Sequence, residues 1–432
     1  MDPLFCVKCL GSFRWLGYTN SLHPCPAVFS RAPAWVASVP KPVTTQDEEP
    51  EVSQTLKPRM AWPDVAKGLS ILGVVLLHIT LAVPEGDKTF AAEANELIAP
   101  LRMPLFFLVS GFFSLKVLGY RCYELFTKRI WFLAVPYVIW APIEIWLKHL
   151  EWHVFLDKPM PDREYLVESV VESSNMYWFL HSLVLFTVVL WACKFVPPWA
   201  RWLIFGLILF AAPLLPYPPL MAKVATYLPC FLFGAFARPW ITRFAEQAFK
   251  PWALVLGLMS YFGARELLMI LAGTEDPYVA QVMSTVATLL HLPGGIILVV
   301  GLAKIPLLGE MLQRIGRHTL IIYISHPIAL TVIFGYYFRY RDGGIGLDAT
   351  GLMGHTNTWI LLCIPVTVFG AFAFQFLSKV PVIGWTIFPP HIDHLVAPIA
   401  RRWHPGDAPR AGTPDARQAG AQGQPSSVGS GN

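Results

Sequence analysis

Three residues in the first apolar segment of the chain have types and a spacing that could do chemistry. Lys67 and His78 are eleven positions apart in the stretch WPDVAKGLSILGVVLLH. In an α-helix this separation is three turns plus about 20°, so both side chains lie on one stripe. Asp64, fourteen positions before His78, falls within about 40° of that stripe. The sequence therefore predicts a line of ionisable groups along one helix face, about 16 Å long between Lys67 and His78.

Other apolar segments also contain polar side chains that could bind or react. Charged groups inside a membrane are costly and usually face the interior of the helix bundle, so each is a candidate for function. We expect most of them between the midplane and one face of the membrane, where they would line a polar cavity. The candidates are Arg102, Glu144, Trp178, His181, Arg265, Glu266, His291 and His326.

Structural explanations for several of these residues stay open at this point. Asp64 and Lys67 would also suit a helix start, and His78 could be a core histidine that is hydrogen-bonded to a neighbouring helix. Arg265 could extend its side chain to the membrane surface, because long cationic side chains do so. Arg102 and Glu144 could form an ion pair that only holds two helices together.

The composition indicates the kind of element that positions these residues. Hydrophobic residues make up 55% of the chain and charged residues 14%, whereas soluble domains have about 25% charged residues. A chain with so few charges cannot cover a surface that faces water. The net charge of +5 comes from basic residues in short loops, which we interpret as topology signals and not as a nucleic-acid site.

Ten segments are long and apolar enough, or nearly so, to cross a membrane as helices. Cations concentrate in alternate loops, and the other loops, such as 148–177, are rich in carboxylates. Because cation-rich loops stay in the cytoplasm, both termini are predicted to be cytoplasmic. The sequence thus predicts an all-α polytopic membrane bundle of about ten transmembrane helices. The predicted spans are 66–84, 98–117, 130–147, 178–196, 201–217, 224–241, 252–271, 282–303, 319–338 and 357–377.

The two ends of the chain differ in composition from its apolar middle. We expect a disordered cytosolic extension over 1–59, a membrane domain over 60–400 and a disordered, low-complexity tail over 401–432. The seven cysteines form no disulfide pattern. Cys6 and Cys9 make an isolated Cys-x-x-Cys pair, which is a weak zinc signal, so no metal is expected.

Four motifs in the apolar region carry a resemblance to a known family. They are R-x-x-W-P-D-V-A-K-G-L-S-I-L-G-V-V-L-L-H at 59–78, R-M-P-L-F-F-L-V-S-G-F-F at 102–113, W-F-L at 178–180 and I-G-R-H-T-L-I-I-Y-I-S-H-P at 315–327. With them the chain resembles the acyltransferase-3 family of integral membrane O-acyltransferases over most of 59–378. It looks most like the branch of fucose acetylases and glucan succinylases, and the trehalose mycolate acetyltransferases are a further candidate branch.

The resemblance implies a reaction and roles for particular residues. The family's pair of a basic residue and a histidine maps onto Lys67 and His78. An acyl group, acetyl before succinyl, would pass from cytosolic acyl-CoA to a hydroxyl group of an envelope glycan or glycolipid. His78 would act as the base or would carry the acyl group transiently. Arg102, or main-chain N–H groups near Ser110, would stabilise the oxyanion, and Lys67 would meet the phosphates of CoA.

The resemblance also implies partners, a location and a set of substrate-binding residues. We expect acyl-CoA as co-substrate without a bound cofactor, contact with membrane lipid and no nucleic acid. The location would be the inner or plasma membrane of a bacterium. The substrate-binding residues would be Asp64, Lys67, Ser110, Glu144, Trp178, His181, Arg265, Glu266 and His326.

Two other classes of protein remain as alternatives. Ionisable residues inside a membrane also mark the substrate path of secondary transporters and lipid exporters. His78, His181, His291 and His326 could instead ligate haem, which would give a coloured protein. The chain has no visible inverted repeat, which argues against the transporter.

Overall fold

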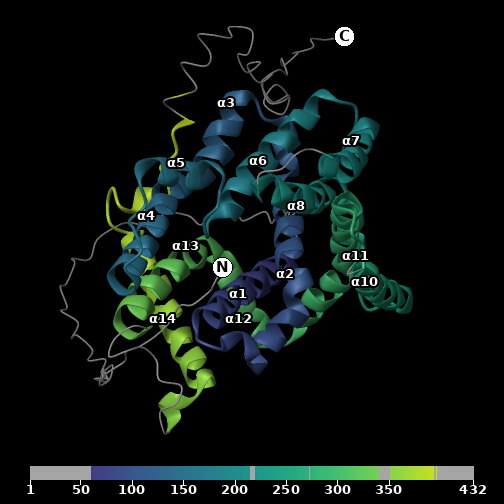
Figure 1. Cartoon of the computed structure of the whole chain (residues 1–432). Coiled ribbons are helices and arrows are strands. Elements are labelled where there is room, and N and C mark those ends of the chain that lie inside the picture. The colour runs from purple at the N-terminus through teal and green to yellow at the C-terminus, as the bar shows by residue number, and fades with distance from the viewer. Residues whose placement is uncertain (1–59, 215–218, 272, 340–350, 394–395, 397–432) are drawn as a thin grey trace, which may run out of the picture. The chain divides into compact units, whose positions relative to one another are not determined.

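The long apolar runs of the sequence form α-helices in the computed structural model of the protein (Figure 1). The structure describes residues 60–214, 219–271, 273–339, 351–393 and 396, and it contains no β-strand within them. The predicted extension over 1–59, with its Cys-x-x-Cys pair, and the predicted tail over 401–432 lie outside the described residues. The predicted fold class, an all-α bundle of apolar helices able to span a membrane, is confirmed.

The helices follow one another with short connections. Two segments, Phe126–Ile130 and Leu330–Arg339 (η6), are π-helices. The α-helices are α1 (Trp62–Ala82), α2 (Phe90–Ser114), α3 (Cys122–Leu125), α4 (Trp131–Leu156), α5 (Arg163–Val171), α6 (Trp178–Ala192), α7 (Pro198–Ala211), α8 (Pro219–Phe236), α9 (Arg238–Glu246), α10 (Pro251–Leu271), α11 (Pro277–Lys304), α12 (Leu308–Arg317), α13 (Thr319–Ala329) and α14 (Thr356–Leu377).

Eight helices of the described part are long and apolar enough to cross a membrane, and a ninth span arises if α8 and α9 count as one. α8 and α9 bend by 78° at their junction. Pro239, at the start of α9, lacks the N–H that would continue the helix of the predicted span 224–241. The predicted span 201–217 corresponds to the shorter apolar helix Pro198–Leu214. Helices therefore occupy all ten predicted positions, but these two fall short of a straight span.

The predicted loop over 148–177 is wrong in its first part. α4 continues to Leu156, and α5 follows as a separate short helix. After residue 147, apolar and aromatic side chains still recur at helical spacing. The helix therefore continues beyond the purely apolar run from which the end of the span was predicted. Lys148 and Glu151 therefore lie on a helix inside the bundle, and Glu151 is fully buried.

Glycines set the closest helix contacts of the bundle. A Cβ atom on Gly68 of α1 would overlap the carbonyl oxygen of Leu312 in α12, and one on Gly316 would overlap the carbonyl oxygen of Asp64. Small residues at such contacts let helix backbones approach closely, which is how helices associate in a lipid environment. This contact holds α12 against the first turns of α1, where the stripe of polar residues begins.

An apolar cluster fixes α1 against the C-terminal helices. Val75 and Ile79 of α1 pack with Phe334 and Phe338 of η6 and with Trp359 of α14, and all five are buried. Close packing of this kind leaves little freedom for the helices to rotate. The face of α1 that bears His78 is thereby held next to α13.

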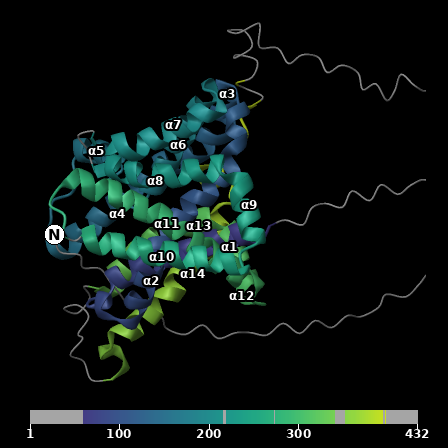
Figure 2. The ribbon, with the colours of Figure 1, turned by 90° about the vertical axis from the view of Figure 1, so that its right-hand side faces the viewer.

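α10 lies at the edge of the described bundle. It packs along α11 and makes no comparable contact with another described helix. In Figure 1 it lies at the right-hand edge, and in Figure 2 this side faces the viewer. Most of its side chains are consequently exposed. Residues on α10 are therefore poorly placed to contribute to a site in the bundle interior.

Candidate active site

Two histidines from helices that are distant in the sequence meet inside the bundle. His78 of α1 and His326 of α13 have ring centroids 5.2 Å apart and ring planes tilted by 37°. The main chains of α1 and α13 also pack together. The helix-face prediction placed His78 in the interior, but only the packing of α13 on α1 brings His326 to it.

The hydrogen bonds of His326 indicate where its proton lies. Nδ1 of His326 is 2.9 Å from the carbonyl oxygen of Ile322. Because a carbonyl only accepts, Nδ1 carries the hydrogen, and the neutral ring then has its lone pair on Nε2. Nε2 is buried and has no hydrogen-bond partner among the described residues. A buried basic nitrogen without a partner is costly to maintain, which favours a role in proton transfer.

A polar cavity of about 660 Å³ begins at His78. Its walls come from α1, α4, α5, the segment before α6, α8 and the α13–η6 junction. Carboxylate, amine, amide and aromatic side chains share the lining, a mixture that suits a ligand with several hydroxyl groups and an apolar face. We call it the polar cavity; it is lined by His78, Leu81, Ala82, Glu144, Ile145, Lys148, His149, Trp152, Tyr165, Ser174, Asn175, Met176, Trp178, Lys223, Pro327, Leu330 and Thr331.

Charged residues of α4 form one wall of the polar cavity. Nζ of Lys148 lies 3.2 Å from Oε2 of Glu151, and both side chains are largely buried. Glu144, one turn before Lys148, is buried and interacts electrostatically with Lys148. Gly335 of η6 leaves room for Glu151, since a Cβ atom there would overlap the carboxylate. The predicted residue Glu144 is thus in the site, but as a neighbour of Lys148 and not of Arg102.

Aromatic side chains support another wall. Trp178 lines the cavity, and its ring stacks on Tyr227 at 5.8 Å. Tyr227 stacks in turn on the buried ring of Phe107 at 5.2 Å. Stacked rings with few rotatable bonds hold the wall in place. The predicted residue Trp178 is therefore positioned at the cavity by α2 and α8.

Arg102 reaches toward α1 from the middle of α2. α2 begins at Phe90, eight residues before the predicted span, so Arg102 lies about three turns inside the helix. Its Nη1 donates to the carbonyl oxygen of Gly73 at 3.4 Å. A Cβ atom on Gly73 would lie 2.9 Å from Cδ of Arg102, so the lack of a side chain at Gly73 leaves room for the Arg102 side chain. Arg102 is close enough to His78 to act on its ring electrostatically.

The lower residues of the predicted stripe have other neighbours. Asp64 is buried, and its Oδ2 lies 3.4 Å from Nε of Arg317, which ties α12 to α1. Nζ of Lys67 lies 5.0 Å from the ring centroid of Phe113. Neither Asp64 nor Lys67 lines the polar cavity. Ser110 donates to the carbonyl oxygen of Phe106 within its own helix at 2.8 Å.

Three further predicted residues lie away from the histidine pair. His181 stacks on Tyr137 with centroids 5.2 Å apart and does not line the polar cavity. Arg265 and Glu266 are exposed on α10, the helix at the edge of the bundle. Since α10 packs on α11, the fold does not bring these two side chains to the site.

An apolar groove of about 860 Å³ is lined by residues next to the histidine pair in the sequence, although neither histidine of the pair lines it. Val75 and Ile79, which flank His78 in α1, line it together with Ile322, whose carbonyl oxygen bonds His326. Most of its other lining residues are aliphatic, but Arg314, His318 and Lys379 also border it. We call it the apolar groove; its walls are α1, the end of α12, α13 and α14 with the residues just after it.

The sequence analysis did not predict several residues that line the polar cavity and the apolar groove. Lys148 was assigned to a loop, and Lys223 to the short connection between the predicted spans 201–217 and 224–241. Both are cations within apolar segments, which is the signal that could have found them. Arg314 and Lys379 were interpreted as topology signals and His318 was assigned no role, because nothing in the local sequence relates them to His78.

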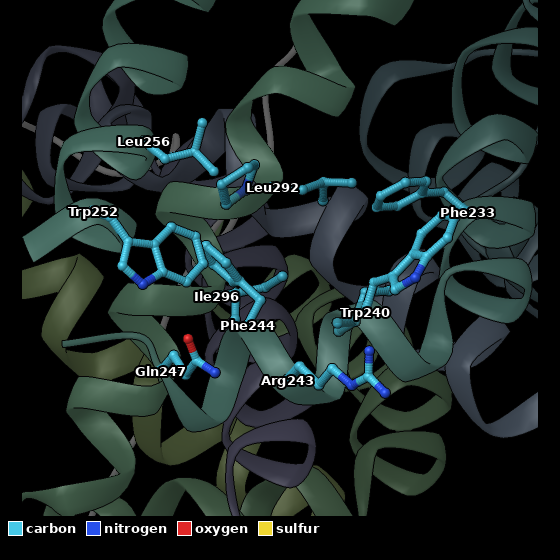
Figure 3. Close-up of a pocket in the computed structure, with 11 residues that line it drawn as sticks. Phe233, Trp240, Arg243, Phe244, Gln247, Trp252, Leu256, Leu292 and Ile296 are labelled. Carbon is cyan, nitrogen blue, oxygen red and sulfur yellow. The ribbon is translucent and has the colours of Figure 1, made fainter. Parts of the chain in front are cut away.

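A third cavity, of about 360 Å³, lies between α8, α9, α10 and α11 (Figure 3). Aromatic and aliphatic side chains form most of its lining, and Figure 3 shows Arg243 and Gln247 beside them. Its lining contains neither histidine of the pair and no residue of α1 or α13. Its residues offer no acid–base pair, so we assign the chemistry to the polar cavity and the apolar groove.

Comparison with known proteins identifies the family. The model of a family described as an acyltransferase domain matches residues 60–376, about three quarters of the chain. The chain belongs to the acyltransferase-3 family. The matched region runs from two residues before α1 to the last turn of α14, so the acyltransferase-3 domain and the helix bundle coincide. The chain is therefore a multi-pass membrane acyltransferase.

Membership of the acyltransferase-3 family bears on the alternative classes. Neither a curated protein nor a solved structure matches the chain. Of the four histidines considered for haem, His78 and His326 lie together, whereas His291 bonds the carbonyl oxygen of Ala287 and contacts Tyr261. The family and this arrangement favour an enzyme over a haem protein or a transporter.

Proposed function

We propose that this acyltransferase moves an acyl group, acetyl as the first candidate, from cytosolic acyl-CoA to a hydroxyl group of an envelope glycan or glycolipid. It would belong to the enzymes that transfer acyl groups other than amino-acyl groups, in the inner membrane of a bacterium. One observation carries the proposal: His78, whose ring lies against that of His326, lines the polar cavity, and its α1 neighbours Val75 and Ile79 line the apolar groove. Two substrates of opposite character could therefore reach the same histidines from two sides.

The apolar groove suits the donor. Acyl-CoA has a highly charged nucleotide end and a long, thin arm that ends in the thioester. Arg314, His318 and Lys379 at the groove would meet its phosphates, because cations recognise phosphate oxygens. The aliphatic walls would enclose the arm, whose thioester would lie near His78. Lys67, on the same helix, would add to the positive potential that attracts the anion.

The polar cavity suits a polyhydroxylated acceptor. Glu144, Lys148 and Asn175 line it and offer both acceptors and donors for hydroxyl groups. Trp152 and Trp178 also line it and would cover the apolar C–H faces of a sugar ring. A site with few polar groups among aromatic surfaces fixes the orientation of such a ligand and so selects one hydroxyl.

The proposed reaction is a direct transfer with a histidine base. His78 takes the proton of the acceptor hydroxyl as its oxygen attacks the thioester carbonyl carbon. The tetrahedral intermediate then expels the CoA thiolate, the carbon–sulfur bond breaks, and the thiolate recovers the proton from the imidazolium. His326, with its lone pair on Nε2, would share the proton with His78 during the step. Histidine is suited to this exchange because its pKa is ordinarily near neutrality.

Arg102 would stabilise the negative charge that develops on the thioester oxygen. Its guanidinium is held against α1 through the carbonyl oxygen of Gly73 and acts electrostatically on His78. A fixed donor aimed at a developing oxyanion contributes about 3 kcal/mol to catalysis in typical cases. Ser110, whose hydroxyl is occupied within α2, is a weaker candidate for this role.

The sidedness of the reaction follows from the loop charges. Arg314 and Lys379 belong to the cation-rich loops, which the positive-inside rule assigns to the cytoplasm. The polar cavity includes Tyr165 of α5 and the residues before α6, from the carboxylate-rich segment assigned to the outside. The donor would thus enter from the cytosol and the acceptor from the opposite face.

Sealed membrane vesicles of both orientations would test this function. Inside-out vesicles that hold acceptor in their lumen should incorporate label from external radiolabelled acetyl-CoA without detergent. Right-side-out vesicles should remain inactive until they are permeabilised. Mass spectrometry of envelope lipids and glycans, from cells with and without the gene, should reveal a product heavier by one acetyl group. Equal incorporation in both orientations would contradict the transbilayer reaction, and no gene-dependent product would contradict the function.

A further inference from the structure

One cation of the polar cavity, Lys223, has no anionic partner among the residues that the structure describes. Lys223 of α8 is half-buried, and it lines the polar cavity together with Trp178. Its Nζ lies 5.0 Å from the ring centroid of Trp178. Among the described residues it forms neither a hydrogen bond nor an ion pair. Its amino group is therefore held at the cavity by an aromatic ring alone.

The other charges of the cavity are matched. Lys148 is paired with Glu151 at 3.2 Å and also interacts with Glu144. Arg339, buried behind them, interacts with both Lys148 and Glu151. Two cations and two carboxylates thus balance one another in this cluster. Lys223, on α8, remains as an additional positive charge of the cavity.

Keeping an ammonium group in such a place has a physical cost. An ionised amine that leaves water requires a counter-charge or several acceptors, and within a membrane protein such groups are usually functional. The face of one tryptophan compensates only part of that cost. The rings that support Trp178, Tyr227 and Phe107, keep the position fixed and do not supply charge.

From this arrangement we infer that the acceptor is acidic: it carries a phosphate or carboxylate group that pairs with Lys223 while one of its hydroxyl groups lies at His78. This inference rests on the proposed function and narrows its acceptor to an anionic glycan or glycolipid. Neutral glycolipids, trehalose mycolates among them, would leave Lys223 without a counter-charge. The carboxylate Glu144, which also lines the cavity, interacts electrostatically with Lys148, and that cation offsets its repulsion of an anion.

The test uses native membranes that contain the full chain, radiolabelled acetyl-CoA and the acceptor already present in them. The labelled product is extracted and applied to an anion-exchange column. We expect it to be retained, and its exact mass then distinguishes phosphate from carboxylate. Membranes that lack the chain define the background.

Variants of Lys223 test whether this residue binds the acidic group of the retained product. Lys223→Gln should lower label incorporation about tenfold or more, the effect expected for losing one hydrogen-bonded charge pair. Lys223→Arg should recover most of it, because the positive charge is kept. Lys158→Gln is the matched control: Lys158 also lies 5.0 Å from a tryptophan ring, that of Trp152, but it is exposed and does not line the cavity. It should retain full activity.

The outcomes separate this inference from the proposed function. A chain-dependent product that flows through the column as a neutral compound would overturn the acidic acceptor and leave the acyltransferase intact. Unchanged incorporation by Lys223→Gln would overturn it as well. If Lys223→Gln and Lys223→Arg lose activity equally, the charge is not what matters, and the inference fails. Absence of any chain-dependent labelled product would refute the proposed function itself.

Discussion

His326 offers the sharpest separation of chemistry from packing in this protein. In His326→Asn the side-chain amide takes the place of Nδ1, so the bond to the carbonyl oxygen of Ile322 is kept. The two outer ring atoms, including Nε2, are lost. If Nε2 shares the proton with His78, acyl transfer should fall about 100-fold, near the lower end of what a general base contributes. That loss corresponds to about 2.7 kcal/mol in the activation barrier.

The expected change in stability is smaller and can be estimated separately. Removing two buried ring atoms costs about 1.5 kcal/mol from lost burial and the small cavity that remains. Both the histidine and the asparagine have one buried atom without a partner, so this term changes little. The free energy of unfolding should therefore decrease by about 1–2 kcal/mol, too little to abolish folding of a protein of this size.

His291 supplies the matched control. It is buried, and its Nδ1 lies 2.7 Å from the carbonyl oxygen of Ala287, four residues earlier in α11, as Ile322 is for His326. It lines neither the polar cavity nor the apolar groove. His291→Asn should have a similar stability cost without the loss of activity.

The measurements are label transfer from acetyl-CoA in inside-out vesicles and reversible unfolding in mixed micelles. If His326→Asn keeps more than about a third of the activity, His326 is no part of the proton path, since removing a general base has a far larger effect. If His291→Asn loses as much activity as His326→Asn, the effect comes from destabilised helices. Either result would refute the reasoning from the unpaired Nε2.

Three further predictions concern other parts of the site. His78→Ala should lower transfer about 100-fold or more at normal membrane abundance, because the general base is lost. Wild-type protein that is given labelled acetyl-CoA without acceptor should stay unlabelled; label trapped on His78 would show that this residue carries the acyl group. Gly73→Val should displace Arg102, because a Cβ atom would lie 2.9 Å from Cδ of Arg102, and should slow transfer about tenfold or more. Gly206→Val is the control, since a Cβ atom there meets nothing within 4 Å, and it should leave the rate of transfer unchanged. A reporter enzyme fused to the C-terminus should be active in the cytoplasm and one inserted near Asp157 should be active outside; the same side for both would disprove the predicted topology.

The class and the main elements of this protein could be predicted from local sequence. A run of about twenty apolar residues has few stable alternatives to a membrane helix, and the eleven-residue spacing of Lys67 and His78 places both on one face because helix geometry is uniform. The errors in the predicted helix ends also have causes in the local sequence. α4 continues past its apolar run to Leu156 because an amphipathic stretch extends it, and α8 ends where Pro239 removes a main-chain donor.

Which helices are neighbours was decided by the tertiary structure. His78 and His326 are 248 positions apart, and no periodicity relates them; the packing of α13 on α1 does. Lys67 shares the stripe of His78 but faces Phe113, because α2 covers that part of α1. Arg265 appears equivalent to Arg102 in sequence, yet α10 lies at the edge of the bundle and leaves it exposed. Helix geometry determines the face on which a residue lies, whereas contacts between segments distant in the sequence determine what that face meets.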